Sequence, residues 1–182
     1  MGKSLTLVKK YMLQYDVGVP LYVILALLVI VIGIVIGLYL TRKNQSSFIR
    51  NSLLTTLGGY LFFVLCTTLF FRESSDTMRY YLIPFWSYDV LNYKVIAQHI
   101  LNVLMFVPIG FLLGAIMNGR RWLQVIENGC LLSVMIEILQ LLTRRGVCNI
   151  DDVIHNTIGC AIGYGTFRLC ETILKRKINI CK

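Results

Sequence analysis

Several long apolar runs constrain the fold of this chain more than any other feature of its sequence. Residues 21–40 contain no charged side chain, and further predominantly apolar runs cover residues 53–71, 95–117, 122–143 and 150–169. An α-helix needs about 20 apolar residues to cross the hydrocarbon core of a bilayer. Helices suit that environment because they satisfy their own backbone hydrogen bonds. The sequence therefore predicts an all-α, polytopic membrane helix bundle of about five transmembrane helices.

The composition agrees with a membrane protein and not with an ordinary soluble domain. Of 182 residues, 57% are hydrophobic and 15% are charged, whereas soluble domains average about 25% charged residues. The length accommodates one membrane domain, residues 1–182, without a separate soluble domain. The net charge of +9 is of the kind that membrane proteins place in their loops. No basic stripe with interleaved aromatic residues lies outside the spans, so no nucleic-acid partner is expected.

The cysteines do not form a recognisable framework. The chain has six cysteines and no Cys-x-x-Cys pair, and four of the six fall in apolar segments, where cysteine behaves as a small hydrophobic residue. No disulfide framework, metal site or cofactor is predicted. Asp151 and His155 would share a helical face, but one histidine beside two acids is more typical of a polar helix start than of a metal site.

Two segments are too polar to span a membrane and are predicted to lie at its surface. In residues 1–20, the apolar side chains of Leu5, Val8 and Met12 surround two lysines, as in an amphipathic interfacial helix. Residues 72–94 mix charges with six aromatic residues. These fit an aromatic belt at headgroup level. Alternatively, Pro84 and its neighbours fold back as a lid over a site among the spans.

The distribution of basic residues predicts the orientation. Five spans place the two termini on opposite sides of the membrane. One side would carry the hinge at 42–50, the turn at 118–121 and the C-terminal tail, which together with Arg168 at the end of the fifth span hold ten of the 18 lysines and arginines. By the positive-inside rule this side, with the C-terminus, is cytoplasmic.

Polar side chains lie inside two of the predicted spans and in the short loop between them. Glu137 and Gln140 are three residues apart and share a helical face, which Arg144 continues. Asp152 and Asn156 are four apart on the next span, an antiparallel neighbour. Ionisable groups within a bilayer are costly and mark functional sites by default. The predicted ligand-binding site comprises Asn102, Glu137, Gln140, Arg144, Arg145, Asp151, Asp152 and Asn156.

Three interpretations of this site remain open. In the first, an arginine holds an anionic group, Glu137 and Asp152 orient that arginine, and the amides donate hydrogen bonds. In the second, the same groups only lock helices together, since interhelical hydrogen bonds of about 1 kcal/mol each can specify packing. In the third, Glu137 or Asp152 is the general base of a membrane-embedded enzyme. No serine or cysteine lies one turn from a histidine in the spans, so a non-enzymatic protein is favoured.

A proline and several glycines are predicted to shape the helix packing. Pro108 removes a backbone donor inside the third span, so a carbonyl one turn earlier needs another partner. The pairs Gly110/Gly114 and Gly159/Gly163 have the spacing that lets two helices approach closely. These pairs fit contacts within one chain or between two chains, so the oligomeric state stays open.

Three motifs in order resemble the VanZ-like family. They are LIPFWS at 82–87, NVLMFVPIGFLLG at 102–114 and EILQLLTRRGVCNIDDVIHNTIGCAIGYG at 137–165. The resemblance implies a family core over residues 80–165. It matches the predicted ligand-binding residues, with one arginine of Arg144 and Arg145 and one aspartate of Asp151 and Asp152 taking each family role. Structural roles are expected for Pro84, Phe106, Pro108, Gly110, Gly114, Gly159 and Gly163.

The resemblance implies a multi-pass protein of the bacterial cytoplasmic membrane. Some family members confer low-level resistance to teicoplanin-type lipoglycopeptides. The expected function is an outward-facing polar pocket that binds a membrane-lipid headgroup, a lipid-linked cell-wall precursor or the lipoglycopeptide. A membrane-embedded enzyme that modifies an envelope lipid and a structural, partner-binding bundle are the alternatives, because a fold alone does not define a chemistry.

Overall fold

The structure is a computed structural model that describes residues 46–70, 74, 76–90, 93–117 and 121–180. Within these residues, four long helices dominate. They are α3 (Ser46–Leu65), α4 (Tyr93–Ile116), α5 (Trp122–Thr143) and α6 (Ile150–Ile180). A π-helical turn, η1 (Cys66–Phe70), extends α3, and a short 3-10 helix, η2 (Trp86–Val90), precedes α4. Two strands of two residues, β1 (Tyr80–Tyr81) and β2 (Cys148–Asn149), complete the described structure.

Three of these helical segments are long and apolar enough to cross a membrane. They are Phe48–Phe70, Val95–Ile116 and Trp122–Thr143, which correspond to the second, third and fourth predicted spans. The first predicted span and the amphipathic segment at residues 1–20 lie outside the described residues, so the structure does not confirm five spans. The mostly helical fold is as predicted, whereas the two short strands were not expected, because a pairing of two residues leaves no periodic pattern.

The fifth predicted span differs most from the structure. Its helix, α6, begins at Ile150 as expected but continues to Ile180, well past residue 169. Two aspartates stand in its first turn, and α6 is not among the helices that qualify as spans by length and composition. The extension has a local cause, because Glu171 pairs with Arg168 at 2.5 Å and with Lys175 at 2.6 Å along the helix. Such pairs at three and four residues stabilise a helix without apolar side chains.

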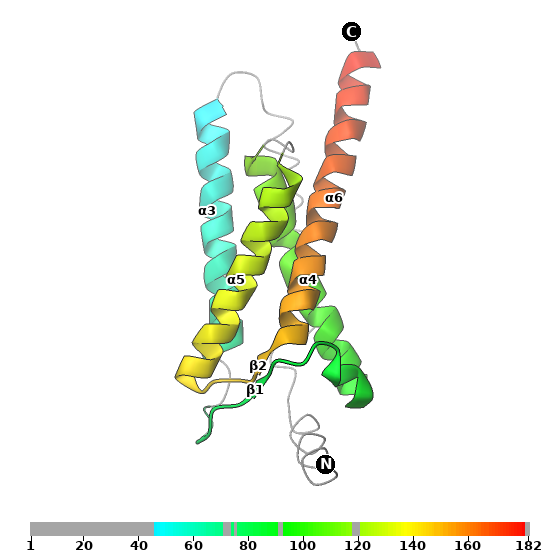
Figure 1. Ribbon diagram of the computed structural model, residues 1–182. Coiled ribbons are helices and arrows are strands. Elements are labelled where there is room, and N and C mark those ends of the chain that lie inside the picture. The colour runs from blue at the N-terminus through cyan, green and yellow to red at the C-terminus, as the bar shows by residue number, and fades with distance from the viewer. Residues whose placement is uncertain (1–45, 71–73, 75, 91–92, 118–120, 181–182) are drawn as a thin grey trace.

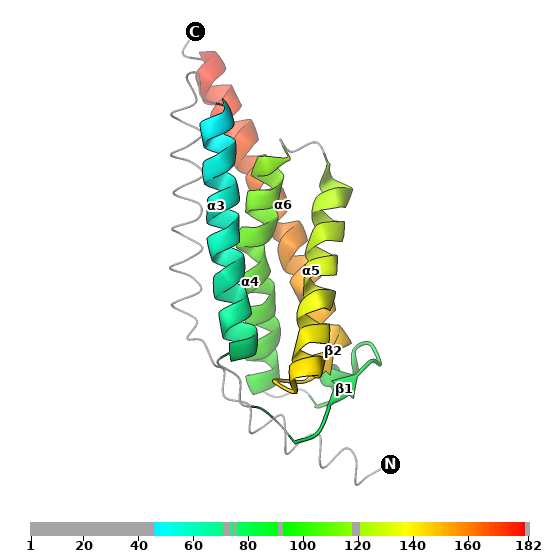
Figure 2. The ribbon, with the colours of Figure 1, turned by 90° about the vertical axis from the view of Figure 1, so that its left-hand side faces the viewer.

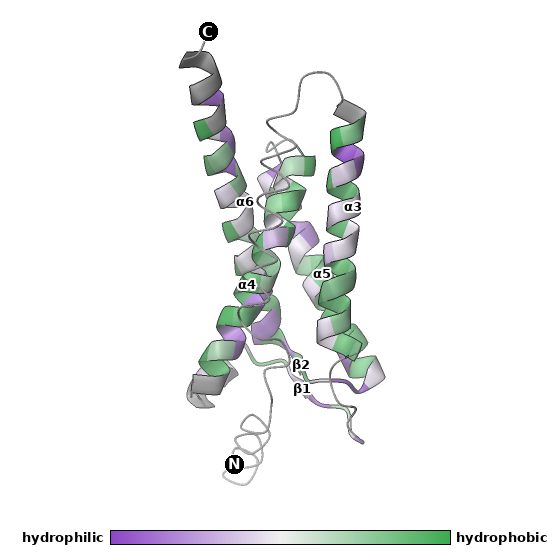
Figure 3. Ribbon diagram, turned by 180° about the vertical axis from the view of Figure 1, so that it is seen from behind, coloured by the Kyte–Doolittle hydropathy of each residue, from purple (hydrophilic) through white to green (hydrophobic). Residues whose placement is uncertain are grey.

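The helices lie side by side, and both strands lie at one end of the bundle (Figure 1, Figure 2). At that end, called the strand end below, α3 with η1 and α5 finish, and α4 and α6 begin. α4 contacts the other three long helices and is the centre of the bundle. Figure 3 shows hydrophobic residues along much of α3, α4 and α5, and hydrophilic residues both at the strands with the adjoining helix ends and towards the opposite ends of α3 and α6. The polar residues that are buried, among them Asn149, Asp151 and His155, lie mainly at the strand end.

Glycines bring α4 and α6 into backbone contact. A methyl group added at Gly110 would lie 1.9 Å from the carbonyl oxygen of Cys160, and one at Gly163 would lie 1.9 Å from that of Val107. At Gly159 the corresponding distance, to the oxygen of Val103, is 2.1 Å. No side chain fits into such spaces, so these glycines allow the approach of the two helices. Of the two uses left open by the sequence, the described glycine pairs serve packing within one chain.

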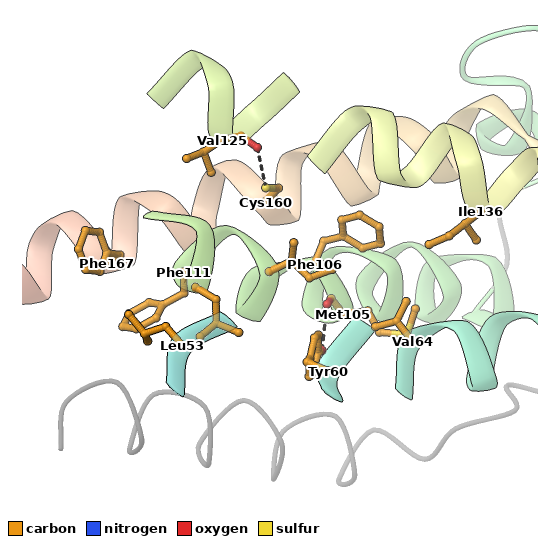
Figure 4. Packing of buried hydrophobic residues seen from close by; sticks show 12 residues of the cluster. Leu53, Tyr60, Val64, Met105, Phe106, Phe111, Val125, Ile136, Cys160 and Phe167 are labelled. Carbon is orange, nitrogen blue, oxygen red and sulfur yellow. Dashed lines mark hydrogen bonds between the residues drawn. The ribbon is translucent and has the colours of Figure 1, made fainter. Parts of the chain in front are cut away.

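The apolar core lies between α3, α4, α5 and α6 (Figure 4). Phe106 is fully buried at its centre. Pro108 interrupts the hydrogen bonding of α4, and close to that point the Tyr60 hydroxyl donates to the carbonyl of Met105 at 2.9 Å. A side chain from α3 thus binds the backbone of α4 one residue after Leu104, whose carbonyl is the one that the proline leaves without an intrahelical donor. The core fixes α4 and α6 as a rigid support for the strand end.

Candidate functional site

The turn between α5 and α6 sets the geometry of the strand end. Arg144 ends α5 in the left-handed conformation, with φ of 55°, and its N–H is directed at the carbonyls of Gln140 and Leu141. Gly146 follows with φ of 116°, a conformation that glycine adopts without strain. β2 then pairs in parallel with β1, aligning Tyr80 with Cys148 and Tyr81 with Asn149. The aromatic segment before α4 is thereby held against the start of α6.

Asn149 connects three elements at this end. Its backbone N–H donates to Glu137 Oε2 at 2.8 Å, and its amide Nδ2 donates to Asp152 Oδ1 at 3.0 Å. Its Oδ1 accepts from the Trp86 indole at 2.8 Å and from the backbone N–H of Asp151 at 3.1 Å. The last bond is that of a helix N-cap. Asn149 was not predicted as a site residue, although an asparagine directly before a helix that begins with two acids is a recognisable capping signal.

The Asp151 carboxylate holds the aromatic segment. Its Oδ1 accepts the N–H of Phe85 at 2.6 Å, and its Oδ2 accepts the N–H of Ser87 at 3.1 Å and the Ser87 hydroxyl. Phe85 has φ of 64°, which costs energy for a residue with a side chain. Asp151, which is fully buried, stabilises that turn after Pro84. The segment therefore folds back over the start of α6, as the lid interpretation expected, while its exposed aromatic side chains also fit the aromatic belt.

The two adjacent aspartates have different partners. Asp151 binds the aromatic segment, whereas Asp152 accepts from Asn149 and, at 3.3 Å, from the Gln98 amide of α4. Both carboxylates are buried. The sequence could not assign the family role to one of them, and in the structure each aspartate organises its own part of the strand end.

Two histidines lie face to face beneath the aromatic segment. The rings of His99 on α4 and His155 on α6 are stacked with centroids 4.1 Å apart and planes 13° apart. His99 Nε2 lies 3.1 Å from the Ser87 hydroxyl, and His155 Nε2 lies 3.0 Å from the Tyr88 hydroxyl. His155 Nδ1 lies 2.6 Å from the carbonyl oxygen of Asp151. His99 and Ser87 were not predicted, because their contact depends on the folding back of the aromatic segment.

Three predicted amide residues lie buried between the helices. Gln140 donates to the carbonyl of Thr68 at 3.2 Å, and Asn156 donates to the Ser133 hydroxyl at 2.8 Å. Yet Asn102 Nδ2, Gln140 Oε1 and Asn156 Oδ1 have no hydrogen-bond partner within the described chain. An unpaired buried polar atom costs about 1–3 kcal/mol. Such atoms are exceptional in folded proteins and call for a ligand or ordered water.

The two predicted arginines lie at the rim of this site. Arg144 is exposed, and Arg145 donates to the carbonyl of Phe70 at 3.1 Å, at the end of η1. Neither arginine is bound to Glu137 or Asp152 in the described part of the chain. The hydrogen bonds described for Glu137 and Asp152 run to Asn149 and Gln98, and not to an arginine that the carboxylates would orient. Arg145 instead links the end of α3 to the end of α5.

The electrostatic effect of the buried carboxylates reaches Cys148. Burial, followed by the nearby charges of Glu137 and Asp152, raises the pKa of the Cys148 thiol. Among the described residues, no group of three or more His, Cys, Asp or Glu side chains is arranged to hold a metal ion. The strand end is thus an acidic and amide-rich site with arginines at its rim.

Comparison with known families identifies the chain. The VanZ/LLP1 family model matches residues 21–171, which extends beyond the core expected at 80–165 in both directions and includes the first predicted span. No curated protein and no solved structure matches the chain. The match covers most of the 182 residues, and three helical segments have the length and composition of membrane spans. This membrane protein therefore belongs to the VanZ/LLP1 family.

Proposed function

We propose that the strand end binds the polar headgroup of a membrane lipid or of a lipid-linked cell-wall precursor. The observation that carries this proposal is the set of three buried polar atoms without a partner, on Asn102, Gln140 and Asn156. They come from three helices, α4, α5 and α6. A hydroxyl- or phosphate-rich headgroup offers both acceptors for the asparagine amide and donors for the two carbonyl oxygens.

The surroundings of the site suit a lipid ligand. Tyr80, Ile83 and Phe85 are exposed in the aromatic segment, and aromatic side chains favour the headgroup level of a bilayer. The strand end also stands at the ends of three candidate spans. An acyl or polyprenyl chain would remain in the bilayer while its headgroup entered the site. The rim arginines, Arg144 foremost because it is exposed, would attract an anionic headgroup.

In a bacterial envelope this site would face outward, with the C-terminus in the cytoplasm. Binding there would alter how a teicoplanin-type lipoglycopeptide meets the membrane or its precursor target. Low-level resistance to such compounds is then the expected phenotype. The membrane lipids themselves are the expected partners.

The test compares susceptibility to teicoplanin with protein abundance in the membrane. Cells expressing the Glu137→Gln variant are expected to lose protection at equal abundance, because Glu137 is buried in the site. The matched control is Glu127→Gln, the same change on an exposed residue of the same helix, which should protect as the parent does. Equal protection by both variants would contradict a role of the site in resistance.

Asn102→Leu separates binding from packing. Removal of an unpaired buried amide leaves stability unchanged or raises it, so a merely structural site would tolerate the change. The proposal expects weaker binding of a polyprenyl-linked precursor or of phosphatidylglycerol by the purified variant, measured by native mass spectrometry. Unchanged binding of both lipids would overturn the proposed site.

An enzymatic function is the second candidate, and one contact favours it. Ser87 and His99 lie within hydrogen-bond distance, as a nucleophile and its base would. However, the Ser87 hydroxyl donates to Asp151, and the N–H groups of Phe85 and Ser87 are bound to the same carboxylate. No backbone donor of that turn remains to stabilise an oxyanion. The geometry therefore supports binding over acyl transfer.

A further inference from the structure

The directions of the hydrogen bonds around the two histidines follow from their partners. A carbonyl oxygen only accepts, so His155 Nδ1 carries a proton toward the carbonyl of Asp151. The neutral ring then accepts at Nε2 from the Tyr88 hydroxyl. The Ser87 hydroxyl donates to the Asp151 carboxylate, so His99 donates through Nε2 to Ser87. Both rings can make all these bonds as neutral groups.

Acid changes this arrangement because the rings are stacked and buried. His99 and His155 are 8% and 7% exposed, with ring centroids 4.1 Å apart. A proton on His99 would be partly balanced by the Asp151 carboxylate through Ser87. A second proton on the pair would place two like charges face to face away from water. Like charges at such a distance repel strongly where water cannot screen them.

The other ionisable groups near the pair do not offset that second charge. From α6, Asp151 contacts His155 through its carbonyl and uses its carboxylate on the aromatic segment. Asp152 of α6 and Glu137 of α5 bind Asn149. From η2, Tyr88 contributes a hydroxyl that can either donate to the ring or accept from it.

The aromatic segment depends on this network for its position. Phe85 and Ser87 are held by Asp151, Trp86 by Asn149 and Tyr88 by His155. All these partners lie at the start of α6, and Phe85 is in an unfavourable backbone conformation. Separation of the histidines would therefore weaken the attachment of the whole segment.

We propose that His99, His155 and the segment they hold form a pH-operated latch over the strand end. With both rings uncharged, the latch is closed. When both rings bind protons, the segment carrying Ser87 and Tyr88 leaves the start of α6. If the strand end binds a headgroup as proposed above, the latch controls access to that site, and this role rests on the proposed function. The movement of the segment can be tested without any ligand.

The test is hydrogen exchange, measured by mass spectrometry on the full chain in nanodiscs of a zwitterionic lipid. From about pH 8 to about pH 4, below the ordinary histidine range because two stacked, buried rings disfavour a second proton, exchange in residues 79–90, corrected for the intrinsic rate, should rise at least about tenfold. Exchange within 122–143 should stay constant. Equal protection of 79–90 at both pH values would overturn the latch.

Two variants show whether the histidines are responsible. His99→Gln keeps a donor for Ser87 and cannot bind a proton, so its aromatic segment should stay protected in acid. Should His99→Gln open with pH as the parent does, the histidine pair is not the sensor and the proposal fails. Tyr88→Phe, which removes one bond without changing a charge, should weaken protection equally at both pH values. Since no lipid ligand is scored, these outcomes are independent of the headgroup-binding test.

Discussion

At the scale of single residues, the strand end is organised by side chains that bind backbone. Asp151 accepts two backbone N–H groups from a segment more than sixty residues earlier in the chain, and Glu137 accepts that of Asn149. Hydrogen bonds from a charged partner are about twice as strong as neutral ones. The carboxylates therefore shape the site before any ligand arrives.

Cys148 reports on these carboxylates. Because its pKa is raised mainly by burial and then by Glu137 and Asp152, its thiolate is scarce at neutral pH. Alkylation of a variant with Cys148 as sole cysteine should therefore be slow at about pH 7.5 and accelerate only above the range of an ordinary thiol, about 8.5. Alkylation quenched at successive times and quantified by mass spectrometry measures the rate of thiol modification.

Removal of one charge tests the cause. Asp152→Asn, in the same single-cysteine background, should lower the pKa of Cys148 and speed its alkylation. An unchanged rate would show that burial alone raises the pKa of the Cys148 thiol.

The raised pKa of Cys148 also determines in which direction this thiol makes the stability of the protein depend on pH. Because the folded-state pKa is the higher one, the thiol's contribution is complete below the unfolded-state pKa and is lost as pH rises through the folded-state pKa.

At the scale of elements, α4 and α6 form the pair on which the site depends. Their backbones touch at Gly110, Gly159 and Gly163. This contact sets the separation of His99 from His155, which stand on these two helices. Loss of close packing between α4 and α6 would therefore disturb the site as well as the core.

Alanine substitutions measure this contact. Gly110→Ala and Gly163→Ala should each destabilise the bundle by about 1–3 kcal/mol, because the added methyl group overlaps a backbone oxygen. Gly58→Ala is the matched control. It lies inside α3 with open space around it, so alanine should be neutral or stabilise by up to about 1 kcal/mol. The midpoint temperature of thermal unfolding in detergent measures these effects. Similar midpoints for all three variants would contradict the close contact between α4 and α6.

Helix limits could be read from the sequence where hydropathy changes at the boundary. The predicted spans at 95–117 and 122–143 agree with α4 and α5 within two residues. The end of α6 could not be placed in this way. Beyond residue 169, the ion pairs of Glu171 with Arg168 and Lys175 help to continue the helix. An average over hydropathy does not detect them.

At the scale of the whole molecule, the orientation in the membrane is the main prediction. A membrane-impermeant thiol reagent, applied at a pH high enough to ionise this thiol, should label Cys148 in intact cells, because the strand end is expected outside. Cys181, in the basic tail, should be labelled only after lysis. Single-cysteine variants analysed by gel shift test this. Labelling of Cys148 only after lysis would invert the topology and place the site in the cytoplasm.

Local sequence was enough to predict the membrane environment and the helical class, and it singled out polar residues such as Glu137, Gln140 and Asp151 that the structure buries. These follow from local properties, since about twenty apolar residues in a row have few other uses and buried ionisable groups inside them are unusual. It also determined the family, through motifs that the match over residues 21–171 confirms.

Tertiary structure decided which of these residues meet. Asp151 binds Phe85 and Ser87, and His155 stacks on His99, across more than fifty residues of intervening chain. Nothing in the local pattern of either segment specifies such a partner, because a hydrogen bond depends on position and direction in space. The same holds for the glycines, whose spacing fits contacts within or between chains until α4 and α6 are seen together. Hydropathy thus predicts the helices, whereas tertiary packing at the strand end brings the side chains of the candidate site together.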